Sequence, residues 1–451
     1  MPILYQEQHN WPWRWLESAL SEASMANKTV IIAIVNKAYV EGDKPMLDMF
    51  LDGFWLGEDT RGLISHLLLV AVDQTSFERC KFLHLHCYKL KADGADFETE
   101  ELYMSQDFIK MMWRRTLFLK EVLRRGYSFV FTDIDVLWLR NPFPRLTSFN
   151  ENIDLQISVD KFNGDEWSQA NPINTGFYMV RSNNRTISLF EEWYARRNNS
   201  TGLKEQDVLN NMMQEGFFRE LGLSVRFLDT LYFSGFCEVS KDFNVVRTVH
   251  ANCCRTISAK VADLTAAIHD WKRFKSLSDS NQPSTLTWTS HEIVRAPGRI
   301  STLVVFCIFN QTTDQCQPFT KINTNSKEDE LESSLYKASM GTYKTVIIAI
   351  VNKAYVEGDK PMLDLFLDGF WHGEDTRGLI SQLLLVAVDQ TSFERCKFLH
   401  LHCHKLEADD PADFEAEKLY MSQDFINMMW RRTLFLKEML KSEATISYSQ
   451  T

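Results

Sequence analysis

The chain of 451 residues is long enough for two or three domains, and its hydrophobic fraction of 45% and charged fraction of 24% are ordinary for a globular protein. A formal net charge of −11 argues against nucleic-acid binding, which requires a basic surface. The apolar run at 303–309 has the length of a strand and is too short to span a bilayer. Residues 1–24 lack the pattern of a signal peptide, so we expect neither a signal peptide nor a membrane anchor in this sequence.

Strand and helix patterns alternate along the first part of the chain. They predict, in chain order, a strand at 29–35, a helix at 45–55 with Pro45 in its first turn, a strand at 67–72, a helix at 105–125 capped by Ser105 and ended by Gly126, and a strand at 129–134. Residues 80–87 fit either the end of a helix or a strand. This alternation predicts an α/β fold with a mostly parallel sheet, in which ligands bind beyond the carboxyl ends of the strands.

A long internal repeat divides the chain. Residues 28–121 recur as residues 344–438 with nine substitutions and one inserted residue, Pro411. Two copies are too few for a solenoid, so we interpret them as a partial tandem duplication, with the second copy as a loosely integrated appendage. We therefore expect an N-terminal extension at 1–26, a complete domain at 27–275, a connecting segment and acidic linker at 276–343, a partial second copy at 344–441 and a tail at 442–451.

Two aspartates interrupt an apolar stretch at 129–139, and the second copy has no counterpart of them. Asp133 and Asp135 are two positions apart, so in an extended strand their carboxylates would point to the same side. Burying two like charges is costly unless a cation compensates them, and a divalent metal with oxygen ligands would do so. The alternative is that the acids cap a turn at the surface. The apolar residues on both sides favour the buried pair with a metal.

Three later stretches also place polar residues beside apolar ones. Residues 174–176 form a predicted turn that leads into an apolar strand, and His250 ends another strand. Gln206 and Asp207 lie near the start of a predicted helix, where simple capping is the alternative to a functional role. A lone histidine is more often structural than a ligand, but a set of two aspartates and one histidine suits manganese better than magnesium.

Cysteine spacing leaves two alternatives open. The nine cysteines form no C-x-x-C pairs, which argues against structural zinc. Cys237 with the Cys253–Cys254 pair can form a disulfide in an oxidising compartment, and buried free thiols explain the spacing equally well. Asn-x-Ser/Thr sequons, which permit a secretory location without requiring it, occur at Asn27, Asn184, Asn198, Asn199 and Asn310.

Five motifs occur in order along the chain: FTDIDVLWLRNPF, NTGFYMVRSNNR, EQDVLN, FLDTLYFSGFCE and VHANCC. With them the chain resembles the plant nucleotide-diphospho-sugar transferase domain of glycosyltransferase family 77, over residues 27–275 and, in part, 344–440. The resemblance implies a GT-A-type, Rossmann-like fold with a mixed, mostly parallel sheet flanked by helices.

The resemblance also implies a function. It implies an enzyme of the Golgi lumen that moves a pentose or hexose from a UDP-sugar to a hydroxyl of a cell-wall glycan or glycoprotein, with retention at the anomeric carbon. The implied cofactor is Mn²⁺, with Mg²⁺ as the alternative. Membrane association is expected from the family, although its usual N-terminal anchor is not visible in this sequence. Both homo- and hetero-oligomers are compatible with the resemblance.

Individual residues receive roles from the same resemblance. Asp133 and Asp135 match the family's D-x-D motif, which binds the metal and the donor diphosphate, and His250 matches a third metal ligand. The remaining positions are Val35, Asn36 and Tyr39 at the uridine, Asn174, Thr175 and Gly176 in a turn beside the donor sugar, Gln206 and Asp207 at the reacting sugar and the acceptor, and Lys260 at the leaving phosphate, where Arg115 or Lys120 are alternatives. The helix pattern favours a salt-bridged face for Lys120.

One position departs from the family. A Phe-Gly pair usually follows the HANCC element, and Arg255–Thr256 replaces it here. Glycine lets a backbone approach a phosphate closely, and threonine does so less easily. This change motivates a second hypothesis, in which the protein is a weakly active or inactive paralogue that acts as a binding or scaffold partner of an active transferase.

Overall fold

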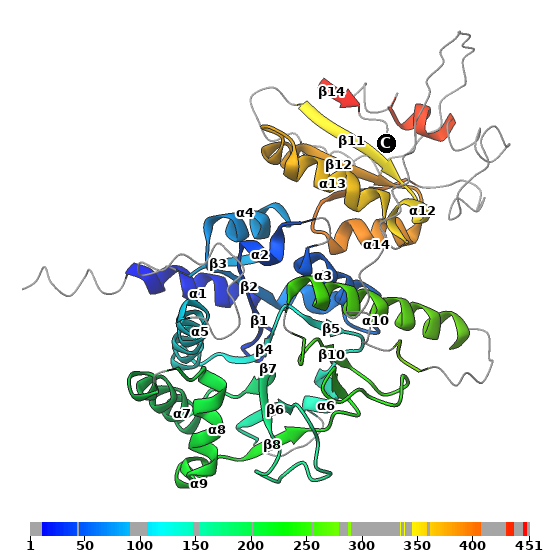
Figure 1. The fold of residues 1–451 in the computed structure, drawn as a ribbon. Helices are drawn as coiled ribbons and strands as arrows, with labels where there is room; N and C mark the ends of the chain where they lie inside the picture. The colour runs from blue at the N-terminus through cyan, green and yellow to red at the C-terminus, as the bar shows by residue number, and fades with distance from the viewer. Residues whose placement is uncertain are drawn as a thin grey trace, which may run out of the picture. The chain divides into compact units, whose positions relative to one another are not determined.

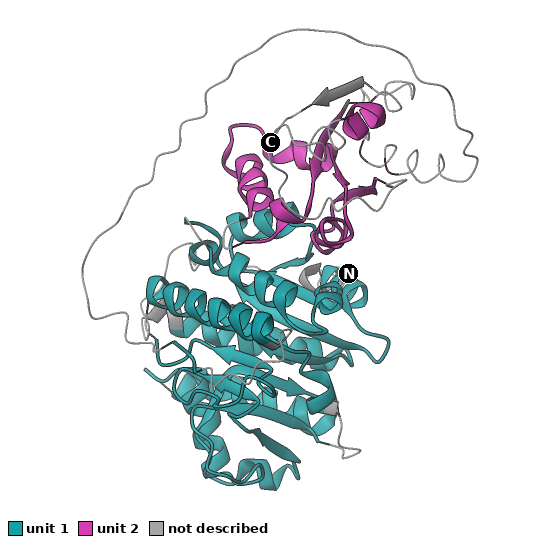
Figure 2. Cartoon of the chain, turned by 90° about the vertical axis from the view of Figure 1, so that its right-hand side faces the viewer, with its two compact units in different colours: residues 1–291 teal, residues 292–451 magenta. Residues whose placement is uncertain are grey.

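In the computed structural model the chain divides into two compact units, residues 1–291 and 292–451, which we describe separately (Figure 2). The structure describes residues 11–42, 45–90, 106–147, 153–200, 202–254, 256–278, 287–289, 334, 338, 345–358, 361–406, 430–436 and 445–448. The apolar run at 303–309, the Ser105 cap and most of the connecting segment lie outside these residues. Among the described helices, none is both long enough and apolar enough to cross a bilayer.

A seven-stranded sheet forms the centre of the first unit (Figure 1). Its order is β3-β2-β1-β4-β7-β6-β8, with β7 antiparallel to both of its neighbours and the other pairs parallel. The strands are β1 (Thr29–Val35), β2 (Leu67–Ala71), β3 (His86–Lys89), β4 (Ser128–Thr132), β6 (Leu155–Val159), β7 (Ile173–Val180) and β8 (Val225–Leu228). This mixed, mostly parallel sheet with flanking helices confirms the predicted α/β class.

A smaller sheet has the order β5-β10-β9 and brings together segments that are distant in sequence. Strand β10 (Thr248–His250) runs antiparallel to β5 (Val136–Trp138) and parallel to β9 (Phe233–Gly235). His250 pairs with Val136, directly after the two aspartates. The sheet therefore carries His250 to the start of β5, where Asp135 lies.

Helices flank both sheets (Figure 1). Near β4 and β7, helices α5, α7 and α8 pack against one another, and α3 packs against α10 beside β5. The helices of this unit are α1 (Trp11–Ala23), α2 (Lys37–Val40), α3 (Met46–Leu56), α4 (Gln74–Phe82), α5 (Gln106–Arg124), α6 (Phe143–Thr147), α7 (Asn184–Ala195), α8 (Glu205–Gln214), α9 (Phe217–Glu220) and α10 (Ile257–Ser278), with 3₁₀ turns at Arg61–His66 and Arg196–Asn199.

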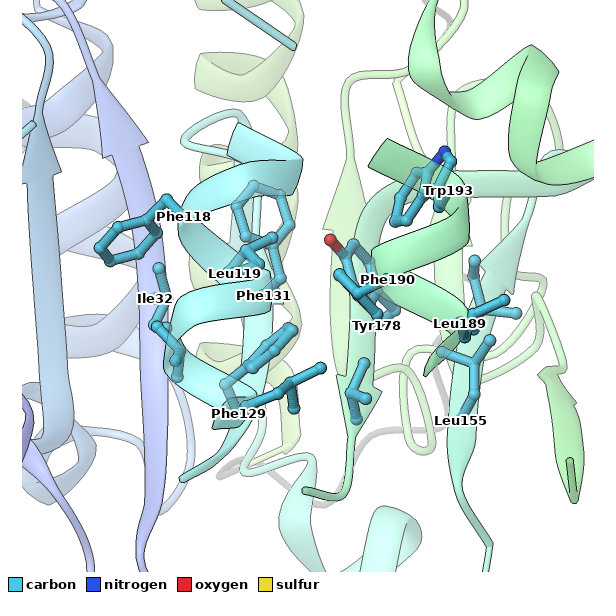
Figure 3. Close-up of a cluster of buried hydrophobic side chains, with 14 of the residues drawn as sticks. Ile32, Phe118, Leu119, Phe129, Phe131, Leu155, Tyr178, Leu189, Phe190 and Trp193 are labelled. Carbon is cyan, nitrogen blue, oxygen red and sulfur yellow. The ribbon is translucent and has the colours of Figure 1, made fainter. Parts of the chain in front are cut away.

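An aromatic core fixes strand β4 in place (Figure 3). Phe129 and Phe131 of β4 are at most 1% exposed and pack with Tyr178 of β7, whose ring centre lies 5.2 Å from that of Phe131. Phe118 of α5 and Phe190 of α7 are buried in the same cluster. Each such side chain contributes about 1.5–3 kcal/mol by leaving water. The cluster therefore holds the strand whose carboxyl end leads into Asp133.

Strand β4 ends earlier than predicted. It stops at Thr132, and the chain turns through the aspartates before β5 begins at Val136. The Asp133 N–H donates to the Gly176 carbonyl (2.6 Å) and the Val136 N–H donates to the Asp133 carbonyl (3.3 Å). The expectation that the aspartates lie within an extended strand was wrong, because β5 leaves the large sheet to pair with β10.

The predicted turn at 174–176 was also wrong. These residues lie inside β7, which pairs with β6 across a register shift between Ile157 and Ser158. The Ser158 hydroxyl donates to the carbonyls of Asn174 (3.1 Å) and Phe177 (2.8 Å) at this irregularity. A register shift within the sheet, and not a turn, therefore lies next to Asp133.

The second unit contains a four-stranded parallel sheet of order β13-β12-β11-β14. Its elements are β11 (Thr345–Val351), α12 (Lys353–Val356), α13 (Met362–His372), a 3₁₀ turn (Arg377–Gln382), β12 (Leu383–Ala387), α14 (Gln390–Phe398), β13 (His402–Lys405) and β14 (Thr445–Tyr448). A small core that includes Val346, Leu384 and Phe435 supports it.

Residues 445–448 were expected to belong to a tail, and they form strand β14 instead. In the first unit Thr29 pairs with Ser128, and in the second unit its repeat counterpart Thr345 pairs with Thr445. Strand β14 thus occupies in its own sheet the place that β4 occupies beside β1. It pairs because alternate backbone groups of β11 would otherwise lack hydrogen-bond partners on that side.

Candidate active site

A cavity of about 490 Å³ opens beyond the carboxyl ends of β1 and β4 in the first unit, and this volume is within the range of small-molecule sites. It is the position at which ligands bind in open α/β sheets. The predicted residues that line it are Val35, Asn36, Tyr39, Asp133, Asp135, Asn174, Thr175, Gly176, Gln206, His250 and Lys260. Asp207, although next to Gln206, is not part of this lining. Arg115, an alternative to Lys260, also lines the cavity, so of the residues singled out from the sequence only Asp207 and Lys120 lie outside its lining.

Asp133, Asp135 and His250 converge in this cavity. Each offers one ligand atom, and the three atoms lie within 4.8 Å of one another. The His250 Nε2 is 3.3 Å from Asp135 Oδ1 and 3.9 Å from Asp133 Oδ2. Two carboxylates and one imidazole are donors that suit Mn²⁺, which accepts both oxygen and nitrogen ligands. The three residues thus have the chemistry and the proximity of a divalent-metal site.

Gly176 allows the three groups to come this close. A Cβ atom at this position would lie 2.2 Å from His250 Cε1 and 2.9 Å from Asp133 Oδ2, distances at which atoms collide. The same atom would lie 2.9 Å from Asn174 Oδ1. The close packing of His250 and Asp133 against β7 therefore requires a residue without a side chain at position 176.

The charge of Asp135 is stabilised from two sides, by Lys260 and by His250. Burial alone would raise the pKa of Asp135, but the Lys260 ammonium and the His250 imidazole outweigh burial and hold the pKa well below its usual range. Burial alone would likewise lower the pKa of His250, and the Asp135 carboxylate raises it above its ordinary value. Asp135 is therefore ionised at neutral pH, as a metal ligand must be.

Lys260 reaches the cavity from the first turns of α10. Its Nζ donates to Asp135 Oδ2 at 2.7 Å. The Thr256 hydroxyl accepts a hydrogen bond from the Ala259 N–H (3.3 Å), and the Thr256 carbonyl accepts one from the Lys260 N–H (3.0 Å). Thr256 thus caps this helix and leaves Lys260 directed into the site.

Arg115 connects the metal-site residues with the start of α8. It is 4% exposed and donates to Asp133 Oδ1 (3.0 Å), to Thr175 Oγ1 (3.2 Å) and to Glu205 Oε1. Burial alone would lower the pKa of Arg115, but the carboxylates of Glu205 and Asp133 raise it. Lys120 does not line the cavity; it lies 3.9 Å from Glu121 and over the Tyr194 ring, so its predicted place on a salt-bridged face agrees with the structure.

Glu205 was missed by the sequence analysis, which assigned the site role to its neighbours. The side chain is 1% exposed and accepts from both Arg115 and the Thr175 hydroxyl (3.0 Å). Gln206 accepts from the Thr175 backbone N–H (3.1 Å) and so contacts the same strand. The sequence signal was present, because an acid that opens a helix and is followed by Gln206 belongs to the same motif. Only its buried arginine partner distinguishes it from a simple cap.

A disulfide closes the wall next to His250. Cys237 and Cys253 form this bond, so the disulfide alternative is confirmed here, and Cys254 is not part of a disulfide. Two further disulfides, Cys80–Cys87 and its repeat counterpart Cys396–Cys403, were missed and exclude buried free thiols at those positions. In both units the bond joins the end of a helix to the start of the next strand.

Comparison with known proteins finds a matching family and several relatives of this chain. The family model for nucleotide-diphospho-sugar transferases matches residues 62–264 and 378–451. An uncharacterized protein of Arabidopsis thaliana is 57% identical over 266 residues, which cover 58% of this chain and 79% of that protein. The beta-arabinofuranosyltransferase RAY1 of the same plant is 25% identical over 227 residues, which cover 48% of this chain and 40% of RAY1.

More distant similarities extend to other transferases. A UDP-D-xylose:L-fucose alpha-1,3-D-xylosyltransferase of Arabidopsis thaliana is 23% identical over 164 residues, covering 36% of this chain and 41% of that protein. The crystal structure of the galactosyltransferase LgtC superposes with a TM-score of 0.34 at 13% identity, covering 56% of this chain and 96% of LgtC. The matched residues 62–264 contain the aspartates, the histidine and Lys260 that converge in the cavity, and the chain belongs to the nucleotide-diphospho-sugar transferase family.

Proposed function

We propose that residues 27–275 are a metal-dependent glycosyltransferase that moves a pentose or hexose from a UDP-sugar to a hydroxyl of a plant cell-wall glycan or glycoprotein. The observation that carries this proposal is the convergence of Asp133, Asp135 and His250 in one cavity with Asn36 and Gln206. The names of the relatives, which include an arabinofuranosyltransferase and a xylosyltransferase that uses UDP-D-xylose, support a nucleotide-pentose donor.

Asp133, Asp135 and His250 would hold a divalent cation, for which we propose Mn²⁺ because imidazole suits manganese better than magnesium. When bound, the cation supplies positive charge to the diphosphate that departs with UDP. Lys260 adds a second positive charge to the same part of the cavity, since its ammonium lies beside Asp135. These groups together stabilise the leaving group without donating a proton to it.

The remaining residues divide the cavity into a nucleotide side and a sugar side. Asn36 and Tyr39 follow β1 and line the nucleotide side, where we place the uridine. Thr175 and Gln206 are joined by a hydrogen bond from the Thr175 N–H and line the sugar side. We assign positioning of the acceptor to Gln206 and give no direct role to Asp207, because Asp207 does not line the cavity.

We propose that transfer retains the configuration at the anomeric carbon through a reaction on one face of the sugar. The bond from the anomeric carbon to the phosphate oxygen breaks as the acceptor oxygen bonds to the same face. The acceptor hydroxyl proton passes to the departing phosphate oxygen, so atoms and charge balance and no separate base is needed. We place the reaction in the Golgi lumen, an oxidising compartment that suits the Cys80–Cys87 and Cys237–Cys253 disulfides.

A donor screen with one matched pair of variants tests this proposal. UDP release from UDP-xylose, UDP-arabinose, UDP-galactose and UDP-glucose would be measured with Mn²⁺ and a mixture of cell-wall oligosaccharides. We expect release from at least one donor, its loss after chelation, and its loss in Asp135→Asn. Asp165→Asn is the control, because Asp165 is exposed and does not line the cavity.

Two results would overturn the proposal. Undiminished Mn²⁺-dependent release by Asp135→Asn, with wild-type thermal stability, would remove Asp135 from the site. Failure of the wild-type chain to bind UDP in calorimetry with Mn²⁺, together with co-purification of an active transferase, would favour the scaffold hypothesis.

A further inference from the structure

Asp160 is a carboxylate of the cavity for which neither the D-x-D motif nor the resemblance provides a role. It follows directly after β6, is partly buried and lines the cavity with the metal-site residues. Its Oδ1 accepts hydrogen bonds from Asn174 Nδ2 (2.8 Å) and Asn252 Nδ2 (2.9 Å). Asp160 is therefore held by two amides, one from β7 and one from the turn that follows β10.

The orientation of both amides is determined by backbone groups. Asn174 Oδ1 accepts from the Gly176 N–H (2.8 Å), and Asn252 Oδ1 accepts from the Cys237 N–H (3.1 Å). Because each amide oxygen is occupied by a backbone donor, each amide nitrogen faces the carboxylate. Both asparagines are at most 9% exposed, so they cannot readily turn away.

The second carboxylate oxygen of Asp160, Oδ2, differs from Oδ1 in its hydrogen bonding. Both hydrogen bonds that the described residues donate to this carboxylate end on Oδ1, and none ends on Oδ2. The Cys237 sulfur lies 3.6 Å from Oδ1 but belongs to a disulfide and has no proton to donate. Asp160 also stands outside the group of Asp133, Asp135 and His250 whose ligand atoms lie within 4.8 Å of one another. The side chain is thus oriented by its neighbours, is not used as a ligand with that group, and keeps one oxygen for another donor.

We propose that Asp160 Oδ2 accepts a hydrogen bond from a hydroxyl of the sugar that occupies the cavity. This inference rests on the proposed glycosyltransferase function and names a recognition residue for it. A carboxylate repels the anionic diphosphate but is a strong acceptor for a neutral hydroxyl, and charged acceptors make the stronger hydrogen bonds. The link from Asp160 through Asn174 to Gly176, next to Asp133, places this acceptor at the edge of the metal site, where the transferred group must lie.

Asp160→Asn isolates this role. The amide oxygen of the new side chain can still accept from Asn174 and Asn252, while an NH₂ group replaces Oδ2, so only the free acceptor is lost. We expect the affinity for UDP with Mn²⁺ to stay within about twofold, since no nucleotide contact changes. We expect kcat/KM for transfer to fall about 10- to 100-fold, which corresponds to loss of one hydrogen bond to a charged group. Asp165→Asn, in the loop that follows Asp160, is the matched control and should match the wild type.

The hydroxyl belongs either to the donor sugar or to the acceptor, and two measurements distinguish these sources. Both use the donors that the wild type turns over. If the hydroxyl belongs to the donor sugar, Asp160→Asn binds the UDP-sugar more weakly than the wild type does, and hydrolysis without an acceptor falls equally. If it belongs to the acceptor, the KM for methyl glycoside acceptors rises while UDP-sugar affinity is unchanged. Either result supports the inference.

Three outcomes overturn it. Wild-type kcat/KM in Asp160→Asn would show that Oδ2 contacts no reacting sugar. A parallel loss of UDP affinity would mean that Asp160 only maintains the shape of the site. Absence of UDP binding by the wild type itself would remove the proposed function and this inference together, whereas normal UDP binding with unchanged transfer removes the inference alone.

Discussion

Lys260 donates to Asp135 at 2.7 Å, although the two residues are 125 positions apart. The pair joins the first turns of α10 to the loop that follows β4, and the carboxylate is 4% exposed. This contact explains how a buried aspartate stays ionised before any ligand is considered. It also places a positive group beside the carboxylates of Asp133 and Asp135.

Lys260→Met is expected to weaken UDP binding in the presence of Mn²⁺ by about 10- to 100-fold, because one charge-assisted hydrogen bond to the diphosphate is lost. Titration calorimetry measures the affinity directly. Lys275→Met is the control on the same helix, since Lys275 pairs with Glu58 outside the cavity. Equal affinities for the two variants would contradict a phosphate role for Lys260.

Gly176→Ala should weaken Mn²⁺ binding at least about tenfold, because the added Cβ would lie 2.2 Å from His250 Cε1 and must displace the imidazole. Electron paramagnetic resonance of Mn²⁺ in the absence of nucleotide provides the measurement. Gly62→Ala is the matched control, since nothing lies within 4 Å of a Cβ added there. Wild-type Mn²⁺ affinity in Gly176→Ala would show that His250 is not a ligand.

Arg115→Met should destabilise the first unit by about 3–5 kcal/mol, because it leaves the buried carboxylate of Glu205 without its counter-charge. Adding Glu205→Gln to this variant removes the stranded charge, and we expect the double variant to be more stable than Arg115→Met alone. Urea unfolding followed by tryptophan fluorescence tests this. Additive losses would mean that the two side chains do not interact.

We expect one disulfide of the first unit to affect both stability and UDP binding, and the other to affect stability alone. Replacing Cys237 and Cys253 with serine is expected to cost about 2–5 kcal/mol of stability and also to weaken UDP binding, since both cysteines line the cavity. Replacing Cys80 and Cys87 should lower stability without changing UDP affinity, because neither lines the cavity. Thermal unfolding and calorimetry on the two double variants separate these effects. Loss of UDP affinity in both would indicate a general effect of unfolding.

The ion pairs of Glu58, which lie outside the cavity, should make the stability of the protein depend on pH. It accepts from Arg140 Nε (2.5 Å) and Lys275 Nζ (2.8 Å); burial acts to raise its pKa, and the two cations outweigh burial and lower it. A lowered folded-state pKa means that the stabilisation is present above the ordinary value of 4.5 and is lost as pH falls through the folded-state pKa. Glu58→Gln should therefore melt below the wild type at pH 7 and together with it near pH 3.

The control for this pH dependence is Glu220→Gln, since Glu220 is exposed and no ion pair holds it among the described residues. Its melting temperature should follow the wild type at both pH values. A constant difference between Glu58→Gln and the wild type across the pH range would assign the effect of that substitution to packing and not to charge.

Sequence patterns predicted the elements whose signals are local. The β-branched run at 29–35 forms β1 with the expected bounds, and the amphipathic pattern at 105–125 forms α5 within one residue at either end. The apolar residues on both sides also singled out Asp133 and Asp135, because burying two like charges is costly without a compensating cation, whereas the ligand role of His250 came from the family resemblance. The inferences about the elements and the aspartates need only periodicity and burial, which neighbouring residues in the chain already determine.

The tertiary structure decided the features that depend on contacts between residues far apart in the sequence. Strand β4 ends at Thr132 because β5 pairs with β10, and residues 174–176 stay within β7 because β6 pairs with this strand on both sides of a register shift. Glu205 differs from a helix cap only through Arg115, 90 positions away, and Asp160 becomes a site residue only through its two asparagines. The residue types of the metal site were thus determined by the sequence itself. The pairing of its supporting charges was decided by the sheet topology, because hydrogen bonds and ion pairs form between residues that folding brings together.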